Sequence, residues 1–401
     1  MTPLWADVLP GTLALLPAVL TWFWGRSLLA LRDDPALAER LLAHRQRILQ
    51  VVVATAVVLG VAAPDALVWT LPLLLIARAA AALPLRRALL GETWTLWQYL
   101  TGGARLYVAW IGFWILLAFS PTLIQPGGWQ AAVIVAGVLV AWNHWYPAIL
   151  LRLLGARPLA DEALAQRFAA VIRRSGVEVP RVWRAGPPGA VIANALALPG
   201  LGHSSVLFSE TLLERLRPEE VTAIFAHEVA HLEQYPPSRL RRLYLGVLLL
   251  IALGTGLVPM LGDLAPWLTS PLQLAWPIVV VVFLLVRARG SQANEFAGDR
   301  RGAELVGDVE LLVNGLVKLH AITLLPRRWE QEMERSASHP SLARRIQALR
   351  GAPQPDAPPL ESPAVFLAAQ PGVVVAFDTD CLRQYWDVPA EGAGALEALE
   401  R

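Results

Sequence analysis

Seven long apolar stretches run through this sequence, and they limit the folds that it can adopt more than any other feature. Each is 17 to 23 residues long and holds at most one charged residue. A helix of about 20 apolar residues is long enough to cross the hydrocarbon core of a membrane. The stretches are 8–25, 48–64, 66–85, 106–125, 129–151, 243–262 and 264–286. They predict a mainly α membrane protein with seven transmembrane helices.

The stretch 66–85 is the weakest of the seven, because it contains Arg78. A charged side chain in the middle of a membrane helix is costly. The alternative for this stretch is a helix that lies in the membrane interface, or re-enters the membrane without crossing it. In that case six helices would cross the membrane.

Composition supports the membrane interpretation and narrows the function. Hydrophobic residues make up 55% of the chain and charged residues 16%, with a mean hydropathy of +0.48. These values are typical of a polytopic membrane protein and unlike those of a soluble enzyme. The net charge of +2 gives no reason to expect a nucleic-acid partner. The single cysteine, Cys381, excludes an internal disulfide framework and a zinc site built from several cysteines.

Arginines gather at alternate ends of the apolar stretches and predict the orientation of the chain. Acidic residues mark the opposite ends, at Asp7, Asp65 and Asp263. Cytoplasmic loops are enriched in Arg and Lys. The pattern therefore places the N-terminus outside the cell, and the long soluble segments and the C-terminus in the cytoplasm. The arginines are Arg26, Arg32, Arg40, Arg45, Arg47, Arg86, Arg87, Arg105, Arg152, Arg157, Arg287 and Arg289.

The apolar stretches also divide the chain. The predicted division is five transmembrane helices in 1–151, a first soluble part in 152–242, two transmembrane helices in 243–286, a second soluble part in 287–351, a proline-rich linker in 352–363 and a small C-terminal appendix in 364–401. Within the soluble parts, helices are expected at 159–175, 210–216, 291–307, 310–325 and 342–350, and strands at 181–185, 190–197 and 205–209.

The first soluble part contains the motif H-E-x-x-H. His227 and His231 lie four residues apart, so one helix face can present both to a metal ion. Glu228 then lies beside the open coordination position, where it can take a proton from a water molecule. The helix is expected to begin near Pro218 and to end at Pro236. The alternative is an ordinary amphipathic helix with two surface histidines.

Three further residues can complete a metal site. Two histidines need a third protein ligand, and Glu295 on a predicted helix can provide it. Asp299 lies four residues later, on the same face, where it can orient a ligand histidine. His339 can donate a hydrogen bond to an oxyanion. Alternatively, the two acids are solvated helix charges, and His339 belongs to the start of the helix at 342–350.

The order of these motifs, from His227-Glu228-x-x-His231 through Glu295-x-x-x-Asp299 to His339-Pro340, resembles the type I CAAX prenyl proteases and the HtpX-type membrane proteases. Asn194-Ala195 is similar to the asparagine-alanine segment on the substrate-binding strand of that family. The resemblance covers about 159–350. The chain departs from the family pattern in two places. Pro236-Pro237 follows the H-E-x-x-H helix closely, and the segment 352–401 has no counterpart in the pattern.

The resemblance implies an α+β gluzincin core in the cytosol that binds one Zn²⁺ per chain through His227, His231 and Glu295. It further implies a zinc metalloendopeptidase in which Glu228 is the base, His339 and Asp299 assist, and the substrate is a peptide or protein that can be associated with the lipid bilayer. Seven spans are similar to the CAAX protease plan. The alternatives are a protease for quality control of membrane proteins, like HtpX, and a catalytically inactive membrane scaffold.

Overall fold

The computed structural model of the chain describes residues 5–31, 37–200, 202–288, 290–329, 334, 337 and 339–351. The predicted linker at 352–363 and the predicted appendix at 364–401 lie outside the described residues.

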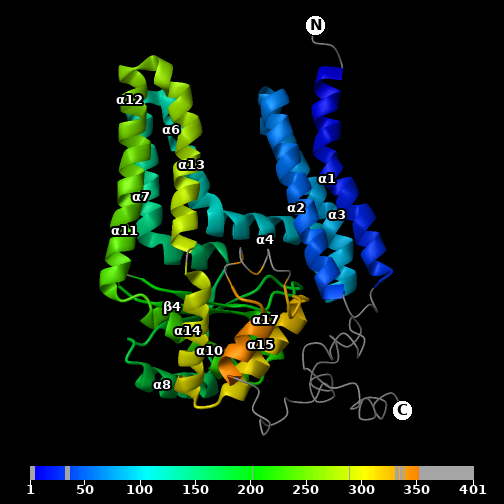
Figure 1. Ribbon diagram of the computed structural model, residues 1–401, viewed down its shortest axis with the longest axis vertical. Coiled ribbons are helices and arrows are strands. Elements are labelled where there is room, and N and C mark those ends of the chain that lie inside the picture. Colours follow the sequence, from blue (N-terminus) through cyan, green and yellow to red (C-terminus); the bar gives the residue numbers. More distant parts are fainter. Residues whose placement is uncertain are drawn as a thin grey trace.

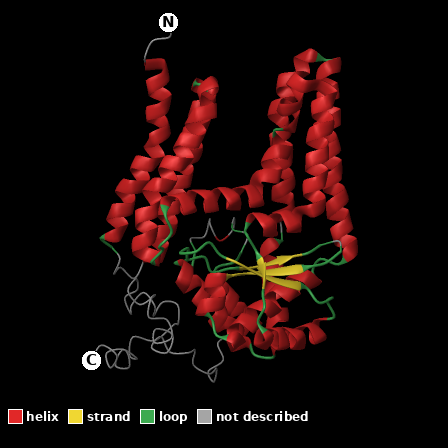
Figure 2. Ribbon diagram, turned by 180° about the vertical axis from the view of Figure 1, so that it is seen from behind, coloured by secondary structure: helices red, strands yellow, loops and turns green. Residues whose placement is uncertain are grey.

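Two groups of helices stand on the same side of a mixed α/β part (Figure 1). The first group is α1 (Trp5–Leu29), α2 (Leu37–Ala62) and α3 (Leu67–Leu90). The second group is α5 (Phe113–Ala118), α6 (Ser120–Ile124), α7 (Gly128–Leu153), α11 (Pro237–Ala252), α12 (Val258–Leu264) and α13 (Thr269–Ala288). Between them α4 (Leu96–Tyr107) lies across the long axes of both groups, as Figures 1 and 2 show.

Six helical stretches of the described chain are long and apolar enough to cross a membrane. They are Val8–Leu29, Leu37–Ala62, Leu96–Ala118, Ser120–Leu153, Pro237–Leu264 and Pro266–Val306. The mainly α membrane fold is therefore confirmed. The helix α3, which carries Arg78, is not one of the six, so the seventh span stays a prediction.

The α/β part contains one mixed four-stranded sheet in the order β1-β2-β4-β3. Its strands are β1 (Arg157–Pro158), β2 (Arg181–Ala185), β3 (Ala195–Leu198) and β4 (Ser205–Ser209). Its helices are α8 (Glu162–Ser175), α9 (Glu210–Arg215), α10 (Pro218–Glu233), α14 (Ser291–Val306), α15 (Val309–Thr323) and α17 (Leu342–Arg350). The central pair β2 and β4 is parallel, and β3 pairs antiparallel with β4 with Ala195 opposite Phe208. The strand β3 is thus an edge strand of this sheet.

The strand expected at 190–197 is wrong at its beginning, because β3 starts only at Ala195. The backbone N–H of Val191 donates to Glu92 Oε1, and that of Ile192 donates to Thr211 Oγ1. These donors are bonded to side chains and cannot join a strand ladder. The two-residue strand β1 was not expected from the sequence. The expected helices of the soluble parts are present, with ends that differ by up to three residues.

Aromatic stacking fixes α10 against the sheet. Phe225 of α10 stacks on Phe168 of α8, with ring centroids 4.0 Å apart, and Phe168 lies 5.9 Å from Phe208 of β4. All three rings are buried in the largest hydrophobic cluster. Fully buried aromatic side chains dominate core energetics, so this stack gives α10 a fixed position.

A buried ion pair fixes the beginning of α10. Glu220 is fully buried and accepts a hydrogen bond from the backbone N–H of Arg217, which closes the first turn. Lys318 of α15, 2% exposed, places its Nζ 2.8 Å from Glu220 Oε1. Breaking a buried pair leaves an uncompensated charge, so the pair ties α15 to the start of α10.

Candidate metal centre

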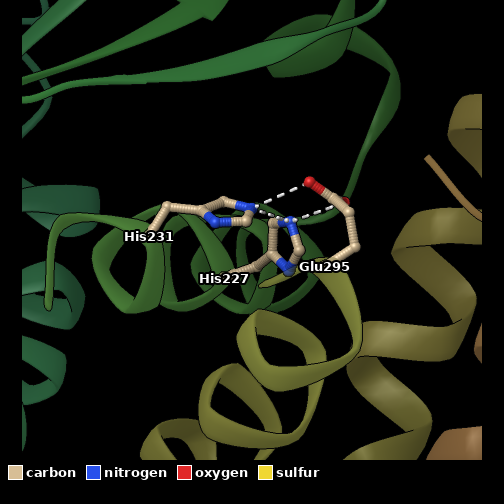
Figure 3. A group of neighbouring side chains, drawn as sticks. All are labelled: His227, His231 and Glu295. Atoms are coloured by element: carbon tan, nitrogen blue, oxygen red, sulfur yellow. Dashed lines mark hydrogen bonds and ion pairs between the residues drawn. The ribbon is translucent and has the colours of Figure 1, made fainter. Parts of the chain in front are cut away.

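His227, His231 and Glu295 bring three possible ligand atoms to one point (Figure 3). The two histidines lie one turn apart on α10, and Glu295 reaches them from α14. His227 Nε2 and His231 Nε2 are 3.0 Å apart, and Glu295 places Oε1 3.3 Å from His231 Nε2 and Oε2 3.8 Å from His227 Nε2. The side chains of His227 and Glu295 are buried.

These distances fit a small tetrahedral cation. Zinc ligands at about 2.0–2.1 Å from the ion lie roughly 3.3 Å from one another in tetrahedral geometry. The three separations of 3.0, 3.3 and 3.8 Å lie around that value. Two imidazoles and one carboxylate are also a ligand set that catalytic zinc takes, and it leaves the fourth position free.

The helix α14 comes close enough to supply Glu295 because a glycine faces α10. A Cβ placed on Gly302 would lie 2.9 Å from the backbone nitrogen and the Cα of His227. Any larger side chain would push the two helices apart. Arg301 adds a second link from the same helix, because its Nε lies 2.9 Å from Glu233 Oε2 of α10.

Asp299 lies behind the histidines, at the position that the sequence predicts for an orienting residue. Its Oδ1 is 3.0 Å from His227 Nδ1, so the carboxylate contacts the ring nitrogen that faces away from Glu295. Arg345 of α17 donates to both oxygens of Asp299, at 2.8 Å from Nε and 2.6 Å from Nη2. Burial alone would raise the pKa of Asp299, but the charge and hydrogen bonds of Arg345, with a contribution from His227, lower it to about 2. Asp299 is therefore ionised at neutral pH.

Glu295 also stays ionised, although it is buried. Burial raises the pKa of this carboxyl, but hydrogen bonds with His231 and His339 outweigh it and hold the pKa well below its ordinary value. His339 places Nδ1 3.1 Å from Glu295 Oε2, and its side chain is 60% exposed. The structure thus brings the predicted residue His339 to the edge of the site, where one side of its ring remains accessible.

Glu228 is buried beside the two histidines. Burial lowers the pKa of His231, but the hydrogen bond to Glu295 and the negative charge of Glu228 raise it above its ordinary value. The carboxylate of Glu228 is therefore close enough to act electrostatically on His231. It supplies no ligand atom to the cluster of three.

Asn194 and Ala195 lie where the chain enters the edge strand β3. The backbone N–H of Asn194 donates to Ser209 Oγ at 2.9 Å, and its carbonyl accepts from the Ser209 N–H at 2.9 Å. The strand itself packs against α10. Asn194 is exposed. The structure therefore places Asn194 and Ala195 at the start of an edge strand beside α10, the helix that carries His227 and His231.

Residues 158–352 match the model of peptidase family M48. We call residues 158–352 the M48 domain, after the family that this segment resembles. Over 275 residues it is 23% identical to Protease HtpX of Legionella pneumophila strain Lens, a match that covers 59% of this chain and 93% of that protein. Protease HtpX of Legionella pneumophila strain Philadelphia 1 is 24% identical with the same coverage. The solved structure of S. mikatae Ste24p gives a TM-score of 0.48 at 16% identity, over 87% of this chain and 99% of that chain.

The similarity of residues 158–352 to peptidase family M48 and the six apolar helices together support an integral membrane metallopeptidase. The matched region contains every residue that the sequence analysis selected for the site, from Asn194 to His339.

Arg345 is a charged residue of the site that the sequence does not predict. Arg345 is 6% exposed, and its Nη2 lies 3.7 Å from Glu295 Oε2 as well as 2.6 Å from Asp299 Oδ1. In the sequence it is one of several arginines of a basic helix, and nothing in their spacing distinguishes the buried one from the exposed Arg344. A buried, ionised acid needs a counter-charge. The signal in the sequence was therefore Asp299, which predicts a basic side chain beside it if it is buried.

Gln234 is a second residue that the sequence analysis missed. Its Oε1 lies 3.4 Å from His231 Nδ1, and its Nε2 donates to the backbone carbonyl of Asn294 at 2.9 Å. The outer nitrogens of both histidines therefore face acceptor oxygens. This arrangement turns the two Nε2 atoms toward Glu295.

Proposed function

We propose that this protein is a zinc metalloendopeptidase that holds one Zn²⁺ per chain with His227, His231 and Glu295. The observation that carries the proposal is the convergence of their three ligand atoms within 4.8 Å of one another, backed by the buried Asp299. When bound, the ion supplies Lewis-acid polarisation of the scissile carbonyl and acidifies a water molecule.

Glu228 is the proposed general base. Its carboxylate takes a proton from the attacking water and then passes that proton to the leaving amine. The 3.0 Å contact of Asp299 Oδ1 with His227 Nδ1 orients His227, while Arg345 keeps Asp299 ionised.

His339 is the proposed donor to the developing oxyanion. Its Nδ1 faces Glu295, so Nε2 is the nitrogen available to the substrate. Both ring nitrogens of an imidazole donate only when the ring is protonated. A preorganised charged donor stabilises an oxyanion more than a neutral one does.

The substrate is proposed to be an extended peptide that pairs with β3. The strand bonds to β4 through one edge only, and its other edge faces no strand among the described residues. Strand addition would hold the peptide through main-chain hydrogen bonds beside α10, with Asn194 and Ala195 at the start of the pairing.

The natural substrate can belong to either of two classes. The predicted seven-span plan resembles the architecture of the CAAX prenyl proteases, and architecture alone does not fix the substrate. The relatives named Protease HtpX are in line with the alternative that the sequence resemblance raised, a protease for quality control of membrane proteins. We carry the first as the proposal and the second as its alternative. No observation favours a catalytically inactive scaffold, because Glu228 and the three ligand residues are all present.

The test uses purified full-length protein in detergent, its bound zinc and a fluorogenic peptide. Wild type should hold about one zinc ion and cleave the peptide, and a chelator should abolish cleavage until zinc is restored. Glu228→Gln keeps the size of the side chain and should retain zinc while losing about 100- to 10,000-fold in hydrolysis. Near-normal hydrolysis by Glu228→Gln would refute the mechanism. Comparative proteomics of membranes with active protein or Glu228→Gln would separate the two substrate classes.

A further inference from the structure

A small cavity among α1, α2, α3 and α4 has an unusual lining. Its volume is about 70 Å³, large enough for a group of several atoms. Arg45, Arg78, Arg86, His44, Tyr99 and Thr21 provide its polar surface. Leucine, isoleucine and alanine side chains form the remainder, and no acidic residue of the described chain lines it.

One of the three arginines already has a counter-charge. Arg86 donates from Nε to Glu92 Oε2 at 2.8 Å, and its Nη2 lies 2.5 Å from Glu92 Oε1. Glu92 is 3% exposed and also accepts from the indole Nε1 of Trp94 at 2.9 Å and from the backbone N–H of Val191. Its oxygens are therefore occupied by these donors. Its negative charge still acts on Arg45 through space, but no ion pair joins it to Arg45 or Arg78 among the described residues.

Arg45 and Arg78 make no hydrogen bond or ion pair with another described residue. The Nε of Arg78 is buried without a partner. Both side chains are half-buried, and a guanidinium that is partly removed from water without a bonded counter-charge is unfavourable, more so between membrane helices. Two half-buried positive charges on one cavity favour an anion between them.

The position of the cavity suggests where this anion comes from. It lies near the ends of α1 and α2 that face the α/β part, where α4 crosses the first helix group (Figure 1). Arg45 is eight residues from the start of α2, or about 12 Å along the helix axis. Nearby, the guanidinium of Arg26 lies 4.8 Å over the ring of Trp22, and Trp side chains gather at membrane interfaces. Basic pockets between membrane helices at this depth receive anionic headgroups.

We propose that this cavity is a binding site for a phosphate group, held between the guanidinium groups of Arg45 and Arg78. Arginine suits phosphate because its planar fork forms paired charge-assisted hydrogen bonds. His44 and Tyr99 provide further polar groups around the oxygens. The headgroup of an anionic phospholipid and free inorganic phosphate share this chemistry. The site does not depend on the peptidase mechanism.

The test measures ligand binding by full-length zinc-loaded protein in a neutral detergent. Phosphatidylglycerol in mixed micelles, phosphatidylcholine in mixed micelles and inorganic phosphate are titrated separately, and the readouts are the unfolding temperature and the lipid retained in native mass spectrometry. The variants are Arg45→Gln, Arg78→Gln and the double variant. Arg105→Gln is the matched control, because Arg105 is exposed on α4 and does not line the cavity.

Wild type should bind phosphatidylglycerol, and each cavity variant should lose about fivefold or more in affinity, the effect of one arginine near an anionic surface. Arg105→Gln should bind as wild type does. Phosphatidylglycerol binding that inorganic phosphate does not displace identifies a lipid headgroup, whereas saturable binding of inorganic phosphate alone identifies a soluble anion. Equal affinities of wild type, double variant and control for both ligands would overturn the proposal.

Failure to fold cannot hide the result. Without an anion, Arg78→Gln removes a half-buried charge whose Nε has no hydrogen-bond partner, so its unfolding temperature should equal or exceed that of wild type. A double variant with Lys at both positions keeps the charges and should retain part of the binding. If all the cavity variants unfold at lower temperature with ligand absent, the arginines have a structural role and the proposal is wrong.

Discussion

Asp299 connects the candidate metal centre to the core of the M48 domain, since it contacts His227 on one side and Arg345 on the other. Asp299→Asn keeps the size of the side chain but removes the charge that both partners face. We expect zinc affinity to fall about 10- to 100-fold, because an outer residue no longer orients a ligand. Zinc competition with a chromogenic chelator measures this change. Glu304→Gln, on the exposed face of the same helix, is the control, and an equal loss there would contradict the expectation.

His339 should behave differently, because it is proposed to act on the substrate and not on the ion. His339→Ala should retain zinc and lose about 100-fold in kcat, the usual effect of removing one oxyanion donor. Zinc content and steady-state peptide kinetics on the same preparation test this. His339→Gln restores a donor without the charge and should recover part of the loss. Loss of zinc from His339→Ala would instead assign the residue to the support of Glu295, which its Nδ1 contacts.

At the scale of elements, the loop between α3 and α4 docks on the segment that leads into β3. The Thr93 N–H donates to the Gly189 carbonyl at 2.8 Å, and Arg87 Nη2 donates to the Trp94 carbonyl at 2.6 Å. Glu92 adds the hydrogen bond from Val191. The membrane part is therefore bonded directly to the chain that positions the proposed substrate strand.

Gly189→Ala should disturb this contact specifically. Gly189 has a φ of +80°, and a Cβ there would lie 2.5 Å from Thr93 Oγ1 and 2.8 Å from Trp94 N. The control is Gly155→Ala, where φ is +64° and nothing lies within 4 Å of the added Cβ. Both variants should cost roughly 1–2 kcal/mol in backbone strain. Only Gly189→Ala should also raise KM for the peptide. Equal KM values in the two variants would show that the contact of the α3–α4 loop does not influence substrate binding.

The sequence predicts the site better than the elements around it. His227 and His231 are four residues apart on one helix, and helical geometry alone places them on one face. Glu295 follows a membrane stretch that returns the chain to the same side, which made its proximity predictable. Arg345 and Gly302 were not predictable, because their roles come from the packing of α17 and α14 against α10 and not from any local pattern.

At the scale of the whole molecule, the arrangement of the membrane part was only partly predictable. Hydropathy finds helices, but it does not report their direction. The segment Leu96–Ala118 is apolar enough to cross a membrane, yet its first half, α4, lies across both helix groups. Its capping box at Thr95 and Gln98 fixes where the helix begins, while the turn into α5 comes from contacts with α7 and α13. Such contacts between distant segments leave no signature in a window of 20 residues.

The orientation of the molecule gives the last prediction, and the chain is well suited to test it. Cys381→Ser removes the only cysteine, so single exposed cysteines can then be placed at will. With an impermeant thiol reagent on intact cells, Asp65→Cys and Asp263→Cys should react, because the acidic ends of the helices are expected outside. Ala88→Cys, at the end of α3, and Asp308→Cys, between α14 and α15, should react only after permeabilisation. The reverse pattern would place the metal centre outside the cytoplasm. Equal labelling of Asp65→Cys and Ala88→Cys would instead mean that α3, with Arg78 in the lining of the proposed anion site, does not cross the membrane.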